Sequence, residues 1–243
     1  YQNVVLKKPK VIFSILILVL LSFGYFSKDF KLDASSDTLL IEGDPDLKYL
    51  REVTERYGAK DFLILTFTPK EPITSENSIN NLLSLKYKIQ SLDWVHSVIT
   101  LLDVPLLSSS DKSLQERLNN LVTLKDENVD KERGFKEILN SPVFRNFVIS
   151  EDGSTTGIIV NIKKDDEIKK LKNKKQIEKY KEKLKKKNHQ NILEIREIIK
   201  SYNEIAKIYL GGIPMIADDM MTFIKNDIVV FGVGVLLFII ATL

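Results

Sequence analysis

The side chains that most often do chemistry in proteins are sparse in this chain, and none is spaced for catalysis. It has two histidines, His96 and His189, which lie far apart in the sequence, and it has no cysteine. A zinc-binding His-Glu-x-x-His helix, a glycine-rich phosphate loop and a nucleophile elbow are all missing from the sequence. We therefore expect no catalytic, cofactor-binding or metal-binding residues, and we expect that the protein is not an enzyme.

Two groups of charged residues are the remaining candidates. Asp218 and Asp219 lie near the start of an expected helix, where a role in transport competes with the plainer interpretation that we favour. In that interpretation both carboxylates are solvated and are stabilised by the helix dipole. The segment Lys163–Lys187 holds 13 lysines and five acidic residues, a net charge of +8. It suits anionic lipid headgroups or an acidic partner, but also an ordinary solvated helix with Glu–Lys pairs.

These residues lie between two apolar runs that carry no charge, Val11–Phe26 and Ile228–Leu243. Both runs predict transmembrane helices. Three lysines precede the first run without any acidic residue, which favours a cytoplasmic N-terminus and an extracytoplasmic loop. A cleaved signal peptide is the alternative for the first run. The bulky residues at its end argue against cleavage, because no small-x-small site follows.

The sequence thus predicts four segments. They are a cytoplasmic flank over 1–10, a transmembrane helix over 11–27, an extracytoplasmic domain over 28–227, and a second transmembrane helix over 228–243. The chain begins with tyrosine and ends inside an apolar run, so we expect a fragment of a longer protein. Neither run contains a side chain that could carry a proton near neutral pH, so we expect any energy-coupling residues outside this sequence.

Within the loop, apolar spacing and turn residues predict an order of helices and strands. Asp44-Pro45 predicts a helix start that leads to a stop at Gly58. The later elements are a strand over 61–68, a helix over 75–92, a strand over 95–101, weak helices around 114–124 and 131–139, a hairpin of 147–150 with 155–162 turning at Asp152-Gly153, a helix over 191–205, a strand over 207–210 and a helix over 215–227. This order predicts an α+β class with a split βαβ, ferredoxin-like sandwich and insertions.

The layout resembles the N-terminal part of resistance–nodulation–division (RND) superfamily exporters, in particular the MMPL-type and hopanoid-associated branch. Its matching segments are the Lys-Lys-Pro-Lys flank with the first apolar run, Asp37-Thr38-Leu39-Leu40, Gly43-Asp44-Pro45-Asp46, Tyr57-Gly58, Ser141-Pro142 to Phe147, Ser150-Glu151-Asp152-Gly153 and Gly212-Ile213-Pro214. The lysine-rich segment Lys163–Lys187 departs from the family pattern.

The resemblance implies a proton-driven inner-membrane transporter that exports hydrophobic or lipid-like substrates, with the loop acting as a periplasmic porter domain. It implies as partners membrane lipids, the remaining transmembrane repeats of the same protein, and a homo-oligomer or periplasmic adaptor; nucleic acid is not expected. A two-span sensor or accessory subunit with an extracytoplasmic ligand- or partner-binding domain is the alternative. An extracytoplasmic enzyme tethered by its spans is the third and least favoured interpretation.

Overall fold

A computed structural model describes residues 9–27, 44–57, 61–107, 121–165 and 167–242. The chain divides into two compact units, Tyr1–Ala34 and Ser35–Leu243, and each is described by itself. The first unit contains one described helix, α1 (Pro9–Ser27). The second unit contains the sheet, the remaining helices and the second apolar run.

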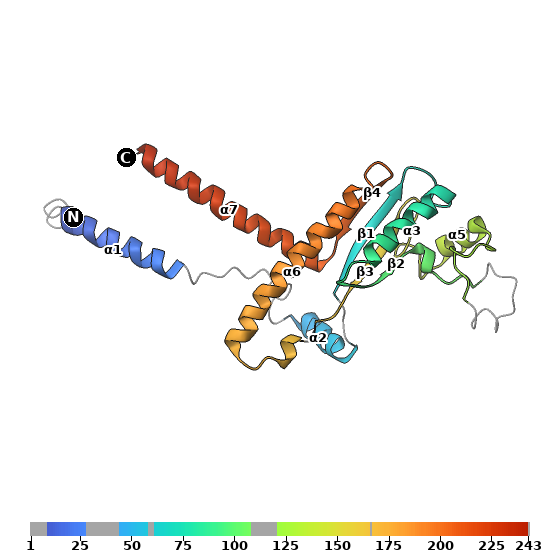
Figure 1. The fold of residues 1–243 in the computed structure, drawn as a ribbon, viewed down its shortest axis with the longest axis horizontal. Helices are drawn as coiled ribbons and strands as arrows, with labels where there is room; N and C mark the ends of the chain where they lie inside the picture. The colour runs from blue at the N-terminus through green and yellow to red at the C-terminus, as the bar shows by residue number, and fades with distance from the viewer. Residues whose placement is uncertain (1–8, 28–43, 58–60, 108–120, 166, 243) are drawn as a thin grey trace. The chain divides into compact units, whose positions relative to one another are not determined.

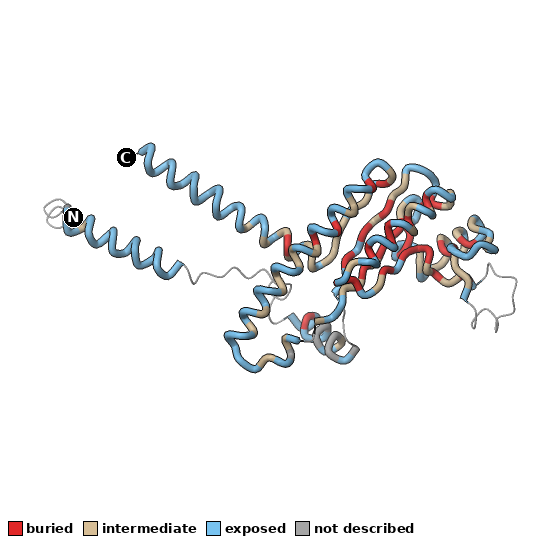
Figure 2. The backbone as a smooth tube through the Cα atoms, viewed as in Figure 1, coloured by how far each residue is buried: buried red, intermediate tan, exposed pale blue. Residues whose placement is uncertain are grey.

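Two helices are long and apolar enough to cross a membrane. One is α1, and the other is the apolar part of α7 (Ile213–Thr242). The apolar windows of both are fully unburied, so neither is a core helix of the domain (Figure 2). The sequence prediction of a helix at each apolar run is therefore confirmed. Exposed apolar side chains along both helices favour a membrane protein.

The second unit is built on a four-stranded sheet in which every neighbouring pair is antiparallel. Its strands lie in the order β2-β3-β1-β4, so β1 and β3 are central and β2 and β4 form the edges (Figure 1). The strand bounds are β1 (Phe62–Pro69), β2 (Val95–Ile99), β3 (Thr156–Ile162) and β4 (Ala206–Gly211). The α+β class and the four predicted principal strands are confirmed.

Two helices cover one face of this sheet and supply most of the remaining core. Alternate residues of the central strands, such as Leu65 and Val160, are fully buried against helix residues such as Leu85 and Ile195. Strand side chains alternate between faces, so the residues between them lie on the other face. The helix bounds are α2 (Pro45–Tyr57), α3 (Glu76–Gln90), α5 (Lys131–Asn140) and α6 (Lys174–Lys200), with short 3-10 turns η3 (Leu101–Asp103) and η4 (Glu167–Lys170).

Side-chain caps fix where the helices begin. Ser75 Oγ accepts a hydrogen bond from the backbone N–H of Ser78 at the start of α3, at 3.1 Å. The carboxylate of Asp44 accepts from the N–H of Asp46 at 2.8 Å, so the predicted start of α2 is confirmed. Each cap satisfies a backbone donor that the first turn of a helix leaves unpaired. The predicted stop at Gly58 lies outside the described residues.

The predicted hairpin forms only in part. Thr156–Ile162 is strand β3, but the first arm is reduced to one bridge between Ile149 and Thr156. The N–H groups of Val148 and Ile149 both donate to the carbonyl of Phe144, which coils the chain before the turn. At the turn, Gly153 alone has a positive φ, 72°, so the expectation of positive angles at both Asp152 and Gly153 was wrong.

The lysine-rich segment is helical from Lys174 onward, as the interpretation of a solvated helix expects. The helix expected over 191–205 is the second half of α6, which begins at Lys174 and ends at Lys200. Asn173 caps its start by accepting from the N–H of Lys175 at 3.0 Å. The weak helix expected around 114–124 lies mostly outside the described residues, and residues 121–124 are not helical.

Candidate functional site: the α6–α7 joint

The helix α7 begins directly against the central strand β1. Gly212 links β4 to α7 with φ at 116°, a conformation that favours glycine. A Cβ at this position would lie 2.8 Å from the carbonyl oxygen of Phe62 and 3.1 Å from the Cα of Leu63. The carbonyl of Gly212 accepts hydrogen bonds from the N–H groups of Met215 and Ile216, which starts the helix. A glycine here lets α7 leave the sheet without a loop.

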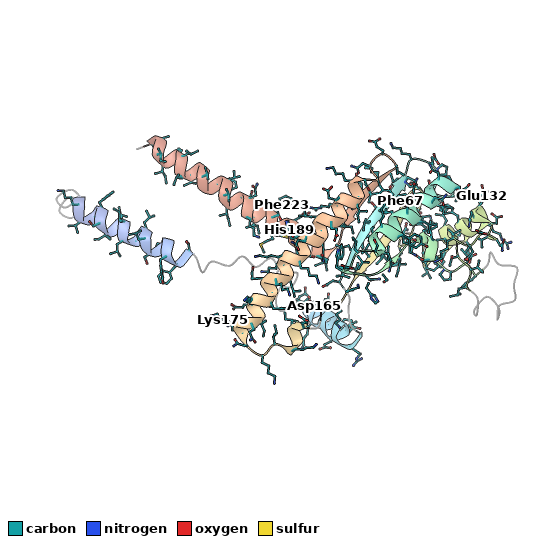
Figure 3. The ribbon with its side chains drawn as sticks, in the orientation of Figure 1. Phe67, Glu132, Asp165, Lys175, His189 and Phe223 are labelled. Carbon is teal, nitrogen blue, oxygen red and sulfur yellow. The ribbon has the colours of Figure 1, made fainter. Side chains whose placement is uncertain are left out.

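Three contacts then fasten the first turns of α7 to α6, and we call this set of six residues the α6–α7 joint. The pairs are Asn188 with Pro214, His189 with Asp218, and Arg196 with Asp219. The Asn188 amide donates to the Pro214 carbonyl at 2.8 Å. The Arg196 Nη2 lies 2.8 Å from both carboxylate oxygens of Asp219. Figure 3 shows His189 where the two helices cross.

The His189–Asp218 pair lies at the centre of the joint. Asp218 is 8% exposed, and both of its carboxylate oxygens lie 3.0 Å from His189 Nδ1. A carboxylate only accepts, so the contact places a proton on Nδ1 of the half-exposed histidine. Burying a carboxylate without a partner costs free energy. The pair with His189 therefore favours the one packing of α6 against α7 in which the two side chains meet.

The expectation that both aspartates are solvated was therefore wrong for Asp218. Their position near a helix start was predicted correctly, but their partners come from 23 to 29 residues away in the sequence. A local pattern carries no information about which helix will pack there. The sequence offered only a weak indication of this pair. His189 is an isolated histidine one turn before the apolar residues of α6.

The joint is continuous with the core because α6 is itself held firmly. Ile192 and Ile195 of α6 are fully buried, and in the sequence they lie between His189 and Arg196. Trp94, at the start of β2, donates from Nε1 to the Glu194 carboxylate at 2.7 Å, which ties α6 to the far edge of the sheet. Trp94 is itself buried, so it packs at this helix–strand junction. Direct side-chain contacts therefore join α7 to α6, and α6 to the sheet.

A second buried ion pair lies elsewhere in the domain and has a structural role. Lys86 contacts Asp103, and Lys125 Nζ lies 3.1 Å from the same carboxylate. Burial raises the pKa of Asp103, but hydrogen bonds from Lys86, the Thr100 N–H and Lys125 outweigh it and leave the pKa below its ordinary value. The Asp103 carboxylate also caps η3 through Thr100. This cluster stabilises the turn after β2.

The sheet face that carries no helices presents apolar side chains to the surface, and we call it the open sheet face. Ile99, Ile159 and Ile64 are direct cross-strand neighbours on β2, β3 and β1. Ile64 is 40% exposed and Ile99 43% exposed, and the neighbouring Tyr209 is 59% exposed. This row of three isoleucines is a candidate contact surface, and it is bordered on the same face by the hydrogen-bonded polar pair Asn161 and Ser97.

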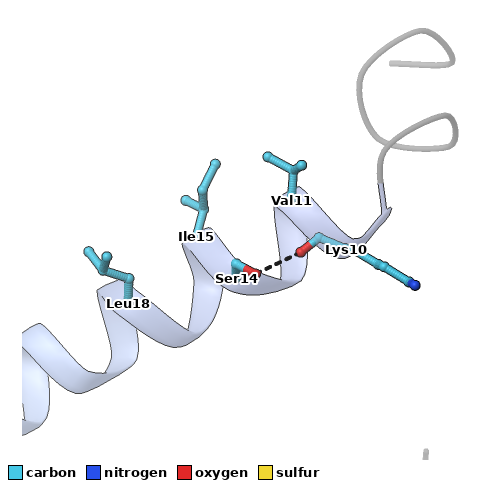
Figure 4. Close-up of a pocket in the computed structure, with 5 residues that line it drawn as sticks. All are labelled: Lys10, Val11, Ser14, Ile15 and Leu18. Atoms are coloured by element: carbon cyan, nitrogen blue, oxygen red, sulfur yellow. Dashed lines mark hydrogen bonds between the residues drawn. The ribbon is translucent and has the colours of Figure 1, made fainter.

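Other residues considered from the sequence are not brought together. His96 is exposed on the edge strand β2, far in the chain from His189. In the described ranges, no group of three or more His, Asp or Glu side chains is placed to hold a metal ion. The hollow beside Lys10, Val11, Ser14, Ile15 and Leu18 follows one side of α1, where the Ser14 hydroxyl donates to the Lys10 carbonyl (Figure 4). It has no opposing wall that could enclose a ligand.

No protein-family model matches the chain, and no curated protein matches it in sequence.

Proposed function

We propose that the chain is the N-terminal part of a proton-driven RND/MMPL-type inner-membrane exporter, with the sheet domain as a periplasmic porter domain. Its substrates are hydrophobic or lipid-like. The observation that carries the proposal is that α7 runs without a break from the sheet, through the α6–α7 joint, into a fully exposed apolar stretch. Alternating-access transport needs such a rigid path between the membrane helices and the outer domain.

The topology of the sheet domain supports the family resemblance. The elements follow the order β1-α3-β2-β3-α6-β4, and the sheet order β2-β3-β1-β4 places β3 between β1 and β2. This arrangement is the one that a split βαβ, ferredoxin-like domain requires, and we propose that fold for the domain. The helix α2 before β1, and η3 with α5 between β2 and β3, are then additions to this core.

The open sheet face supports the substrate class. A row of isoleucines across three strands gives an apolar surface that does not need the directional hydrogen bonds of a polar ligand. A hydrophobic or amphipathic molecule that moves along the periplasmic side would gain by covering this surface. We place the substrate path along this face.

The proposal predicts that transport depends on the continuity of α7. In the full-length protein, a Gly-Ser linker inserted between Ile224 and Asp227 should abolish export of a candidate lipid or dye from energised vesicles. Folding and membrane insertion should persist, because the α6–α7 joint and the apolar stretch are both left intact. Measured surface expression and resistance to alkaline extraction would verify this.

The matched control is the same linker inserted between Glu127 and Asn128, which lie in an exposed turn far from α7 in the sequence. That variant should export normally. A double change, Asp218→Ala with Asp219→Ala, leaves α7 continuous and removes both ionic contacts of the joint, so export should fall only in part. Full export by the Ile224–Asp227 linker variant would refute the coupling role and favour a passive binding domain.

A further inference from the structure

The lysine-rich segment Lys163–Lys187 folds into an arm of its own. The hydroxyl of Tyr180 on α6 lies 2.8 Å from the Asp165 carboxylate and 2.9 Å from that of Glu167. These contacts turn the chain around η4 and bring it back along α6, and they raise the pKa of Tyr180 above its ordinary value. The basic segment is therefore a defined surface rather than an unstructured tail.

One side of this arm is predominantly basic, with Glu182 as the acidic residue beside its lysines. Lys175, Lys179, Lys183 and Lys186 follow the spacing i, i+4, i+8 and i+11, so they share one face of α6, and all four are exposed. We call these four residues the lysine face. The opposite side of the helix carries the half-buried or buried residues Ile177, Tyr180, Leu184, Asn188, Ile192 and Ile195.

The direction of α7 shows where the lysine face points. The helix α7 begins beside β1, on the sheet side of α6, crosses α6 at the joint and continues past it. The side of α6 that is turned away from the sheet therefore faces the direction in which α7 continues, toward the apolar stretch of α7. The lysine face is on that side. Figure 3 shows Lys175 on the part of α6 that extends beyond the crossing at His189.

The distance along α7 brings the lysine face to a membrane surface. From Asp218 in the joint to Ile228 at the apolar stretch is ten residues, or about 15 Å of helix. The radius of α6 with its side chains covers about 5–6 Å of this length. About 10 Å then remains between the surface of α6 and the start of the apolar stretch. The headgroup layer occupies about 5–8 Å of this distance, and charges attract one another across a Debye length of about 8 Å, so the lysines are within reach of the headgroups.

We propose that the lysine face binds the anionic phospholipid headgroups of the bilayer that α7 crosses. The inference rests on the part of the proposed function that places the apolar stretch of α7 in the bilayer. Charge complementarity favours lipid phosphates, because lysine ammonium groups bind them without fixed geometry. Binding along this face would hold α6 parallel to the membrane surface. It would thereby set the angle between the sheet domain and the bilayer.

The test uses the full chain, which has no natural cysteine, reconstituted in lipid nanodiscs. A fluorophore is attached through Gln176→Cys, an exposed neutral position on the arm. A nitroxide on the lipid headgroups quenches it at contact range. Discs of phosphatidylcholine alone are compared with discs that also contain phosphatidylglycerol, at low salt and at about 1 M salt, where the Debye length is about 3 Å.

We expect strong quenching with phosphatidylglycerol at low salt, and loss of it at high salt. Each lysine near an anionic surface strengthens binding about fivefold. The variant with Lys175, Lys179, Lys183 and Lys186 changed to Gln should therefore lose most of the quenching. A control of equal charge change, Lys70, Lys136, Lys200 and Lys207 to Gln, should keep it.

Equal quenching in the two lipid mixtures would overturn the proposal. An equal loss of quenching in the lysine-face variant and in the control variant would overturn it as well. Resistance of the chain to alkaline extraction from phosphatidylcholine is measured first. Failure at that step refutes the bilayer placement on which both proposals rest. Insertion without anion-dependent quenching refutes only the role of the lysine face, and leaves the transport proposal to the linker experiment.

Discussion

Replacing Gly212 by alanine should destabilise the outer domain at the point where it meets α7. The backbone at Gly212 has φ at 116°, and holding a residue with a side chain there costs about 1–3 kcal/mol. The new Cβ would also lie 2.8 Å from the Phe62 carbonyl oxygen and 3.1 Å from the Leu63 Cα. Both are backbone atoms of a central strand, so they cannot turn away as a side chain would.

The two effects together give an expected loss of about 3 kcal/mol or more in the free energy of unfolding, since overpacking adds about 1–3 kcal/mol to the backbone strain. For a domain of this size, a loss of 3 kcal/mol lowers the melting temperature by about 6–12 °C. The neighbouring glycine is the matched control. At Gly211 the nearest atom to a new Cβ is 3.7 Å away, an ordinary contact. Gly211→Ala should change stability by less than about 1 kcal/mol.

Urea unfolding of the full chain in detergent micelles can measure this difference through Trp94, the single tryptophan. Trp94 is 7% exposed and hydrogen-bonded to Glu194, so its fluorescence reports the outer domain rather than the apolar helices. Equal midpoints for Gly212→Ala and Gly211→Ala would refute the reasoning, because the two changes differ only in φ and in the distance to β1.

Three further predictions concern the core, the start of α6 and the buried ion pair. Val160→Asp should abolish cooperative unfolding of the domain, because Val160 is fully buried on a central strand where a carboxylate would have no partner. Lys174→Asp, at the exposed first position of α6, should be tolerated, since an acidic residue at a helix start is favourable. The pKa of Asp103 is lower in the folded state than in the unfolded state. The ionised carboxylate therefore stabilises the fold fully above the unfolded-state pKa, near pH 4, and this stabilisation is lost as the pH falls through the folded-state pKa. Asp103→Asn should therefore flatten the dependence of stability on pH below about pH 4, and an unchanged acid limb would contradict the assigned contacts.

Sequence patterns alone were sufficient for the elements whose signals are local. The two apolar runs, the Asp44 cap and the strand over 155–162 all depend on residues within a few positions of one another, and the structure has a helix or strand at each predicted place. Helix and strand periodicities are properties of the backbone, so they can be read without knowing what packs against them.

Local turn patterns were less reliable where a competing contact exists. The residues before Glu151 have strand-like types, but the carbonyl of Phe144 accepts from the N–H of Val148, which a full first hairpin arm would have paired with β3. Asp152 keeps a negative φ because its carboxylate accepts from the Ser150 hydroxyl and from Ser154, contacts that lower the pKa of Asp152 to about 2. The turn was predicted in the right place but with the wrong geometry.

The functional surfaces were decided by the tertiary structure. The sequence contains His189 and Asp218, but only the crossing of α6 and α7 makes them a buried pair. It contains the lysines of α6, but only the path of α7 past that helix gives the lysine face a direction. Both depend on contacts between residues more than 20 positions apart, which cooperative packing of the core selects and which no local pattern encodes.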